Sequence, residues 1–429
     1  MKFHIETFGC TANVGDEMKM RAIFKNAGHE LVGGAEEADV VVVNTCTVTK
    51  RTELNVLKRL RELEALKERG QGEALKERGQ GKEVVVAGCI AAAQPELVRS
   101  VLGENVKMIT PRDLFDFEVE VPLEFDGVVA VIPISTGCLG NCSYCIVKRA
   151  RGELRSRKPE EVCEAVRSAV ARGAREIRIT SQDCSAYGYD RREGCAGVGS
   201  RTRLPELLER VATVEVAGDF RIRVGMMNPF SVARILDDLL EAFDSEKVFK
   251  FFHLPVQSGS DKVLGEMRRN YKAADFVEIV KSIRRRFEDC TVCTDFIVGF
   301  PTETEADFVA SLDLLGAVKP ERVNVTRFSP RPGTEAAGLK DLLEREKKRR
   351  SRIFSAACRR LALAKNKELE GTVLQVLVTE KGKRGGVVAR DALYRTVVVK
   401  SEPPPALGAT CKVRVAEARS GYLVGEVKV

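Results

Sequence analysis

Short runs of apolar, β-branched residues alternate with amphipathic stretches over the first part of the chain. Continuous runs of this kind predict strands of a parallel sheet covered on both faces, and the helical periodicity between them predicts helices. The expected strands are Lys2–Phe8, Asp39–Asn44 and Glu83–Ala87, and the expected helices are Gly15–Asn26 and stretches from Arg51 and from Gln94. Residues 1–112 are therefore predicted to form a parallel α/β domain, followed by an acidic linker over residues 113–127.

The same alternation of strands and helices resumes after the linker. The expected strands are Val128–Ile134, Glu176–Thr180, Phe220–Val224, Val248–Leu254, Thr291–Val298 and Arg322–Phe328. Helices are expected between them, among others at Pro159–Ala171, Ala273–Phe287 and Glu303–Leu315. Six such units predict a partial (β/α)6 barrel over residues 128–340, with functional side chains on the loops that follow the strands.

The pattern changes twice more before the chain ends. Residues 341–367 predict a very basic connecting helix. From Gly371 onward, short alternating strands separated by Gly and Pro turns predict a small antiparallel β-barrel over residues 368–429. Residues 366–429 carry 11 basic and 7 acidic side chains, which is half of the net charge of +8. A basic barrel of this size favours nucleic-acid binding.

Composition narrows the class of protein. The chain has 429 residues, of which 44% are apolar, and it contains no apolar run long enough to span a bilayer. Its N-terminus lacks the pattern of a secretory signal. Thirteen cysteines in such a chain indicate a reducing compartment with metal or redox use, so we expect a cytoplasmic protein that does not bind membranes.

Three cysteines follow the first barrel strand in a C-x3-C-x2-C spacing, Cys138, Cys142 and Cys145. Three thiolates can hold three corners of a [4Fe-4S] cluster and leave one iron open. An open iron can bind the amino and carboxylate groups of S-adenosylmethionine, and an electron then splits that molecule into methionine and a carbon radical. Structural zinc fits less well, because it usually needs four ligands and the three histidines of the chain lie elsewhere in the sequence.

Each strand of the N-terminal domain is also followed by a cysteine: Cys10, Cys46 and Cys89. The carboxyl ends of parallel strands meet at one edge of a sheet, so we expect the three thiols to converge. The alternative is that each is a small buried hydrophobe. Three such positions at one edge favour a second iron–sulfur cluster, which stays a hypothesis here.

Polar groups follow the other barrel strands too. A cofactor pocket is predicted from Gln182, Asn228, Gln257 and Ser258, although each of their Gly- and Pro-containing segments could also be a plain turn. Tyr144, inside the cysteine loop, could pack on the adenine of S-adenosylmethionine or act as a wedge that holds the loop.

Candidate RNA contacts come from the basic C-terminal third. They are Arg349, Arg350, Lys383, Arg384 and Arg395. Tyr394 and Tyr422 are the rings available for base stacking in the small barrel. The alternative for the charge run is a solvated helix face.

Two other features receive no function. Residues 64–72 are repeated directly at 73–81, which we interpret as a tolerated surface insertion. The remaining cysteines are expected in the core, and they are Cys163, Cys184, Cys195, Cys290, Cys293, Cys358 and Cys411.

With both cysteine triplets in place, the chain resembles the radical S-adenosylmethionine methylthiotransferases over almost its whole length. The resemblance implies a C-terminal barrel of the TRAM type, a cluster at Cys138, Cys142 and Cys145 that cleaves S-adenosylmethionine, and an auxiliary cluster at the other triplet that delivers sulfur. Lys148 and Ala150, together with the segments at 180–188 and 225–229, are similar to the threonylcarbamoyladenosine branch.

That branch implies addition of a methylthio group to C2 of N6-threonylcarbamoyladenosine in the anticodon loop of tRNA. An electron donor and a sulfur source, both unidentified, are implied as well. The chain resembles the archaeal type, because it stops at Val429 without a membrane-anchoring tail, and we expect a monomer. Removing residues 368–429 is expected to weaken tRNA binding and to leave cleavage of S-adenosylmethionine intact.

Two alternatives stay open. Other branches of the family act on isopentenyladenosine in tRNA or on a ribosomal protein. A non-catalytic iron–sulfur protein that binds RNA belongs to a different class, and formation of 5′-deoxyadenosine separates it from the enzymes.

Overall fold

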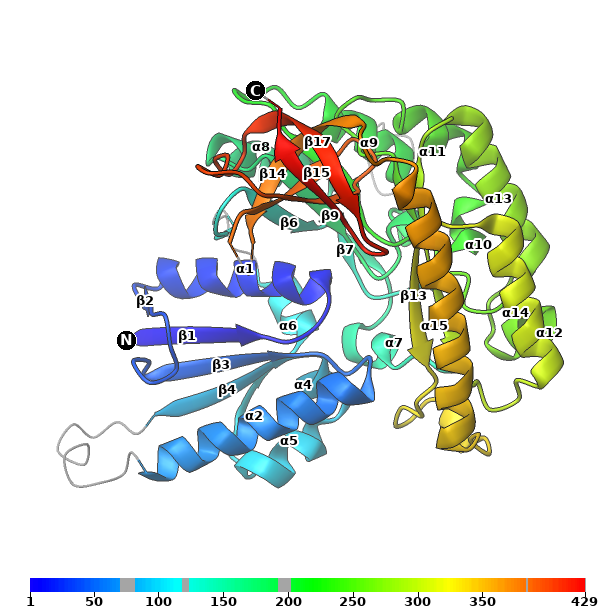
Figure 1. Cartoon of the computed structure of the whole chain (residues 1–429). Helices are drawn as coiled ribbons and strands as arrows, with labels where there is room; N and C mark the ends of the chain where they lie inside the picture. The colour runs from blue at the N-terminus through cyan, green and yellow to red at the C-terminus, as the bar shows by residue number, and fades with distance from the viewer. Residues whose placement is uncertain (70–81, 118–122, 192–201, 383–384, 429) are drawn as a thin grey trace.

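The computed structural model describes the chain except for residues 70–81, 118–122, 192–201, 383–384 and 429 (Figure 1). Three parts follow one another along the chain: an N-terminal α/β domain, a central open barrel with helices around it, and a small C-terminal β-barrel (Figure 1). The tandem repeat falls mostly outside the described residues, as do Cys195, Lys383 and Arg384. In the described part of the chain, no helix has both the length and the apolar character needed to cross a membrane.

The N-terminal sheet is parallel throughout, in the order β2-β1-β3-β4-β5. Its strands are β1 (Lys2–Thr7), β2 (Glu30–Leu31), β3 (Val40–Thr45), β4 (Glu83–Gly88) and β5 (Lys107–Ile109). Its helices are α1 (Thr11–Asn26), α2 (Lys50–Arg69), α4 (Cys89–Ala93), α5 (Pro95–Leu102) and α6 (Pro111–Asp116). The predicted parallel α/β fold is confirmed, with two short edge strands, β2 and β5, that the sequence pattern did not reveal.

Helices cover both faces of this sheet, which explains the continuous valine run of β3. Val40 and Val42 pack with Met20 of α1 on one face, whereas Val41 and Val43 pack with helix α2 on the other (Figure 1). Every residue of β3 is buried, so no polar alternation is visible in the sequence.

The boundary of the domain lies later than predicted. Helix α6 begins at Pro111, and Leu114 is buried in the same apolar cluster as Val40 and Val42. The N-terminal domain therefore extends to Asp116 at least, and the predicted boundary at residue 112 would cut a packed helix.

Two parallel three-stranded sheets form the central open barrel, β6-β9-β10 and β11-β12-β13. The strands are β6 (Val129–Pro133), β9 (Glu176–Thr180), β10 (Arg221–Val224), β11 (Phe251–His253), β12 (Thr291–Val298) and β13 (Arg322–Arg327). Parallel bridges from Ile222 to Val248 and from Met226 to His253 join the two sheets. The six strands thus follow chain order, as the partial barrel predicted.

Helices surround the outside of this barrel. They are α8 (Pro159–Ala171), α9 (Leu204–Ala212), α10 (Pro229–Val232), α11 (Leu236–Ala242), α12 (Asp261–Glu266), α13 (Ala273–Arg286) and α14 (Glu305–Val318). Along β12, Val292, Phe296 and Val298 belong to the core shared with these helices. Because side chains alternate along a strand, Cys293 and Asp295 point to the opposite, inner side of the barrel.

Helix α15 (Glu344–Lys367) closes the barrel beside β13 and α14 (Figure 1). Its Phe354 is fully buried between Phe296 and Phe308. The connecting helix is therefore a packed wall of the barrel on one side and a charged surface on the other.

The C-terminal strands form a closed barrel in the order β14-β15-β16-β18-β17. They are β14 (Val373–Lys381), β15 (Val387–Asp391), β16 (Thr396–Val399), β17 (Thr410–Ala418) and β18 (Leu423–Val427). Four pairings are antiparallel, but β16 and β18 pair in parallel, which corrects the prediction of a purely antiparallel barrel.

Candidate functional site

The loop with the C-x3-C-x2-C spacing lies between β7 (Ser135–Thr136) and α7 (Val147–Arg151). Gly137 has φ of 76°, and a Cβ at this position would lie 1.9 Å from the carbonyl oxygen of Glu153, so a glycine is required. The backbone N–H of Cys138 donates to the oxygen of Gly152 at 3.1 Å. Both ends of the loop are thus tied together before any metal is bound.

A buried arginine connects this loop to the loops after β10 and β11. Arg269 is 8% exposed, and its Nη1 lies 3.6 Å from Sγ of Cys142. Its Nη2 donates to Oδ1 of Asn228 at 3.2 Å and to the oxygen of Pro255 at 3.0 Å. Sequence reasoning missed Arg269, because its role comes from contacts between loops that are distant along the chain.

Two buried polar atoms beside the cysteine loop have no hydrogen-bond partner among the described residues. They are Oε1 of Gln182 and Oγ1 of Thr136. The strand β7 and the loop after β9 are adjacent here, since Ser135 and Ser181 share a hydrogen bond of 2.6 Å. Buried polar atoms without partners are rare and need an explanation. A polar cofactor bound beside the cysteines would supply the missing partners, so Gln182 fits its predicted place.

Asp183 next to Gln182 is engaged within the protein. Its carboxylate accepts hydrogen bonds from Ser185, from the backbone N–H of Asn228 and from Ser231. Burial raises the pKa of Asp183, and these hydrogen bonds act in the opposite direction. Asp183 therefore holds the loops after β9 and β10 together.

The other four predicted cofactor residues lie in different surroundings. Ser258 is 1% exposed, and its hydroxyl is taken by Ser311 and by the backbone N–H of Ser260, which corrects its assignment to the cofactor pocket. Tyr144 packs in an apolar cluster with Phe300 and Phe328, which supports its interpretation as a wedge.

Gln257 lies in the loop after β11, and Asn228 lies in the loop after β10, where Arg269 connects it to Cys142. Gln257 has φ of 74°, in the left-handed region, and its backbone N–H donates to the oxygen of Asp295 at 2.8 Å. Asn228 caps α10 through the backbone N–H of Phe230 and also accepts from Arg269. The side-chain carbonyl of Asn228 therefore already accepts hydrogen bonds from within the protein.

The second triplet converges as expected. Cys10 is the N-cap residue of α1, Cys46 follows β3, and Cys89 is the first residue of α4. A Cβ on Gly9 would lie 2.6 Å from Cβ of Cys46, which shows how closely the loops approach. Burial, together with the nearby Cys46 and Cys10 thiols, raises the pKa of Cys89 to about 12, although Arg151 acts in the opposite direction. The three thiols thus lie within electrostatic reach of one another.

A helix contact connects the two triplets. Cys89 and Ala93 of α4 pack with Ile146 and with Ala150 of α7 in one buried cluster. Because Cys145 directly precedes Ile146, the last ligand of one candidate site and the last ligand of the other lie on segments in direct contact.

Donor chemistry and spacing fit clusters better than single ions. In the described part of the chain, the one group of three donors within 4.8 Å of one another is His253, Cys293 and Asp295. The sulfur atoms of neither cysteine triplet all lie within 4.8 Å of one another. Thiolates around a single zinc ion would lie within that distance, because Zn–S bonds are about 2.3 Å long. Soft thiolates at wider spacing suit iron–sulfur clusters.

The His253 group lies on the inner side of the barrel. Nε2 of His253 is 3.1 Å from Oδ1 of Asp295, which also accepts from Asn324 at 2.7 Å. Burial lowers the pKa of His253, but the hydrogen bonds to Asp295 and Cys293 outweigh it and raise the pKa to about 9. The ordinary explanation, an internal ion pair between two strands, suffices for this group.

Replacing His253 by glutamine is expected to flatten the pH dependence of stability. A folded-state pKa of about 9 lies above the ordinary value of 6.5, so the charged pair stabilises the fold fully below about pH 6.5. That contribution, about 3 kcal/mol at most, is lost as the pH rises to about 9. Urea unfolding at pH 6, 7.5 and 9 measures it. Parallel pH curves for the variant and the parent would contradict the assignment.

The predicted RNA contacts separate into three groups. Arg350 is 5% exposed and bonds to Glu303 and Glu346, so it is a structural cation and its assignment to RNA is wrong. Arg349 is exposed but paired with Glu346 and Glu305. Arg395 pairs with Asp391 at 2.6 Å. Lys383 and Arg384 lie outside the described residues.

The two candidate rings differ in the same way. Tyr394 is 6% exposed and packs against the central barrel, so it cannot stack on a base. Tyr422 is 42% exposed and keeps its predicted role.

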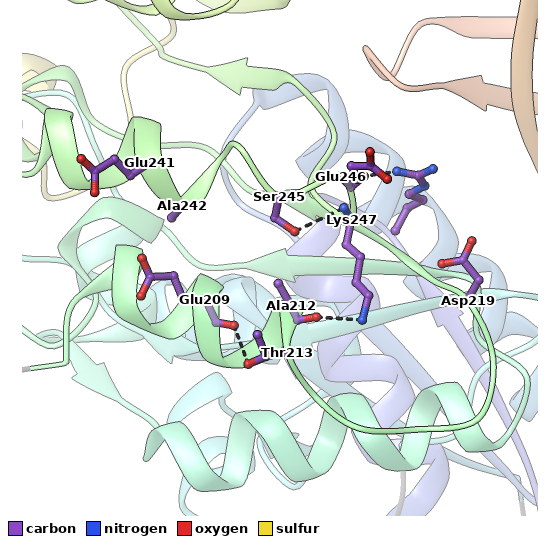
Figure 2. Close-up of a pocket in the computed structure, with 10 residues that line it drawn as sticks. Glu209, Ala212, Thr213, Asp219, Glu241, Ala242, Ser245, Glu246 and Lys247 are labelled. Atoms are coloured by element: carbon purple, nitrogen blue, oxygen red, sulfur yellow. Dashed lines mark hydrogen bonds between the residues drawn. The ribbon is translucent and has the colours of Figure 1, made fainter.

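A surface pocket of about 430 Å³ lies at the start of β10, between the ends of α9 and α11 (Figure 2). Its two cations are engaged, since Nζ of Lys247 donates to the oxygen of Ala212 at 2.7 Å and Arg221 donates to that of Glu246. Its other charges are carboxylates, among them Glu209 and Glu241, that point to solvent (Figure 2). Nothing in this pocket supplies chemistry.

Three family models match successive parts of the chain. The Uncharacterized protein family UPF0004 matches residues 2–109, the Radical SAM superfamily matches residues 132–315, and the TRAM domain matches residues 367–428. The Radical SAM match includes Cys138, Cys142 and Cys145, and the first match includes the other triplet.

Curated relatives match from end to end. A probable threonylcarbamoyladenosine tRNA methylthiotransferase of Archaeoglobus fulgidus is 38% identical over 100% of this chain and 99% of the relative. Its counterpart in Pyrococcus horikoshii is 36% identical with the same coverage. The threonylcarbamoyladenosine tRNA methylthiotransferase of Drosophila melanogaster is 32% identical over 99% of this chain and 77% of the relative.

Among solved structures, the radical S-adenosylmethionine methyltransferase TsrM of Kitasatospora setae is similar in fold. The TM-score is 0.55 at 13% identity, over 78% of this chain and 75% of that one. At this identity the likeness concerns the fold alone.

Proposed function

Since this chain belongs to the threonylcarbamoyladenosine tRNA methylthiotransferase family, we propose that it adds a methylthio group to C2 of N6-threonylcarbamoyladenosine beside the anticodon of tRNA. The observation that supports the proposal is the contact between α4 and α7, because α4 begins with Cys89 and α7 begins just after Cys145. A radical-forming site and a sulfur-carrying site must both reach one carbon of the substrate. Neighbouring triplets meet that requirement.

The Radical SAM domain implies S-adenosylmethionine and one [4Fe-4S] cluster. Cys138, Cys142 and Cys145 would hold the cluster, and together the two groups supply reductive cleavage to a carbon radical. Gln182 and Thr136 offer the unpartnered polar atoms that suit the polar cofactor. Arg269 orders the cysteine loop through Cys142 and is buried away from water. The protein thus contributes placement and exclusion of water.

A second [4Fe-4S] cluster at Cys10, Cys46 and Cys89 is part of the proposal. The convergence of three soft thiol ligands at one edge of the sheet supports it. A methylthio group needs a sulfur atom that N6-threonylcarbamoyladenosine does not contain, so a sulfur source must supply sulfur to this site. An electron donor must supply the electron that the site at Cys138, Cys142 and Cys145 needs.

The C-terminal barrel is proposed to hold the tRNA. A TRAM domain model matches it, and Tyr422 offers an exposed ring for stacking. Bases of an anticodon loop are single-stranded, so presenting the target base costs about a few kcal/mol at most. We propose that the protein works in the cytoplasm, since all twelve cysteines in the described residues are free thiols.

Reaction of the anaerobically reconstituted protein with defined tRNAs tests the function. With S-adenosylmethionine, dithionite and sulfide, tRNA that carries N6-threonylcarbamoyladenosine is expected to yield its 2-methylthio derivative, detected by mass spectrometry of nucleosides. The matched substrate carries isopentenyladenosine at the same position. Product from the isopentenyl substrate alone would reassign the branch, and absence of 5′-deoxyadenosine would favour a non-catalytic RNA-binding protein.

A further inference from the structure

An arginine of the radical domain reaches the second cysteine triplet. Arg151 is the last residue of α7 and is 5% exposed. Its Nη2 donates to Oδ2 of Asp16 at 2.5 Å, and Asp16 lies on α1 of the N-terminal domain. The ion pair therefore crosses the domain boundary where α7 packs on α4, the helix that begins with Cys89.

The same residue adjoins the second triplet. Its neighbour on α7, Ala150, packs with Cys89 in one buried cluster, and its partner Asp16 lies on the helix whose N-cap is Cys10. Burial lowers the pKa of Arg151, but the charges of Asp16, Cys89 and Cys10 outweigh it and raise the pKa. A guanidinium has five N–H groups. Asp16 is the one acceptor recorded for Arg151 within the described residues, so donors remain for a second anion.

We propose that Arg151 is a positioning residue of the site formed by Cys10, Cys46 and Cys89, where it balances the negative charge of the thiolate ligands and their cluster. The inference rests on the proposed function, because it requires that these thiols hold a cluster. Thiolates gathered in a buried site repel one another, and a buried cation offsets that cost. Since the cation comes from α7, the site is complete only when the two domains are docked.

The chain offers a matched control in Arg331. This residue lies in the loop after β13, is 3% exposed, and bonds to Glu53 of α2 and to Thr47. It is another buried ion pair between the same two domains. Arg151, however, directly follows Ala150, which packs with Cys89 in one buried cluster. An effect of domain docking alone would appear in both arginine variants, and an effect of charge at the thiols would appear only in Arg151.

The experiment uses the full chain with Cys138, Cys142 and Cys145 replaced by alanine, so that iron reports the second triplet. Four proteins are reconstituted: the parent, D16N, D16N/R151M and R331M. The comparison of D16N/R151M with D16N isolates the effect of losing Arg151. In both variants Asp16 is already replaced by a neutral residue, so no buried carboxylate is left unpaired. The readouts are iron and sulfide content, the rate of iron loss to a chelator, and the midpoint potential of the cluster by redox titration.

We expect the potential to rise in D16N, to fall again in D16N/R151M, and to stay at the parent value in R331M. Loss of iron should be about tenfold faster in D16N/R151M than in D16N, which is the usual effect of removing a residue that supports the metal ligands without binding the metal. Equal midpoint potentials and equal rates of iron loss in D16N and D16N/R151M would overturn the role of Arg151 but leave the auxiliary cluster in place. A parent that binds no iron would overturn it together with the auxiliary cluster. If D16N/R151M does not fold, D16N/R151Q removes the same charge with a polar side chain. A potential below that of D16N is expected for it, and a potential equal to that of D16N would contradict the role of Arg151.

Discussion

Replacing Cys138, Cys142 and Cys145 together by alanine is expected to abolish formation of 5′-deoxyadenosine from S-adenosylmethionine. The three thiols are the proposed cluster ligands within the Radical SAM match, and they share one short loop held by Gly137 and Gly152. Without them no cluster can pass an electron to the cofactor, so the loss should be complete. Chromatography of the products after anaerobic reaction with dithionite measures it.

The iron content separates this triplet from the other one. If both sites hold a four-iron cluster, each triple variant should lose about half of the bound iron. The variant lacking Cys10, Cys46 and Cys89 should keep forming 5′-deoxyadenosine while losing the methylthio product. If the variant that lacks Cys10, Cys46 and Cys89 kept its full iron content, that result would contradict the auxiliary cluster.

Cys163 provides the control for both triple variants. It is a buried cysteine of α8, 9% exposed, and it packs in the main apolar core of the barrel. Burial raises its pKa, as it does for Cys89, so a raised pKa alone does not distinguish a ligand from a core thiol. Cys163→Ala should leave iron content and 5′-deoxyadenosine formation unchanged.

Buried parallel strands were the part of the fold that the sequence predicted best. The predicted strands at Glu176–Thr180 and Thr291–Val298 agree with β9 and β12 residue for residue. A run that is buried on both faces leaves a continuous apolar signal. The edge strands β2 and β5 left none, because they are only two and three residues long and are not fully buried. The parallel pairing of β16 with β18 is a long-range choice that no local pattern encodes.

In the candidate site, too, the sequence predicted the features that depend on local pattern and missed those that depend on long-range contacts. The cysteines were found because their spacing and their place after strands are local properties. Arg151 and Arg269 were missed, because a buried cation is defined by what surrounds it in the fold. Arg350 and Tyr394 were misassigned for the converse reason, since a charge run or a ring in the sequence does not reveal which side chains face inward.

Tyr394 changes what the C-terminal barrel is expected to do. Its ring lies 4.9 Å from that of Phe249 and 5.1 Å from that of Phe251, measured between centroids. Its hydroxyl donates to Oε1 of Glu176 at 2.6 Å, and Glu176 is fully buried. The small barrel therefore covers one end of the central barrel. Deleting residues 368–429 would uncover these groups, so we now expect it to destabilise the radical domain as well as to weaken tRNA binding.

Tyr394→Ala is accordingly expected to lower the free energy of unfolding by about 3–5 kcal/mol, the usual cost of removing a buried ring. Loss of the donor to Glu176 adds to this cost. Tyr422→Ala is the matched control, because Tyr422 is a tyrosine of the same barrel that is 42% exposed. It should change stability by no more than about 0.5 kcal/mol, yet weaken tRNA binding by about 1–3 kcal/mol if its ring stacks on a base. Urea unfolding and tRNA titration of both variants decide the matter, since equal stabilities would mean that Tyr394 does not hold the two barrels together.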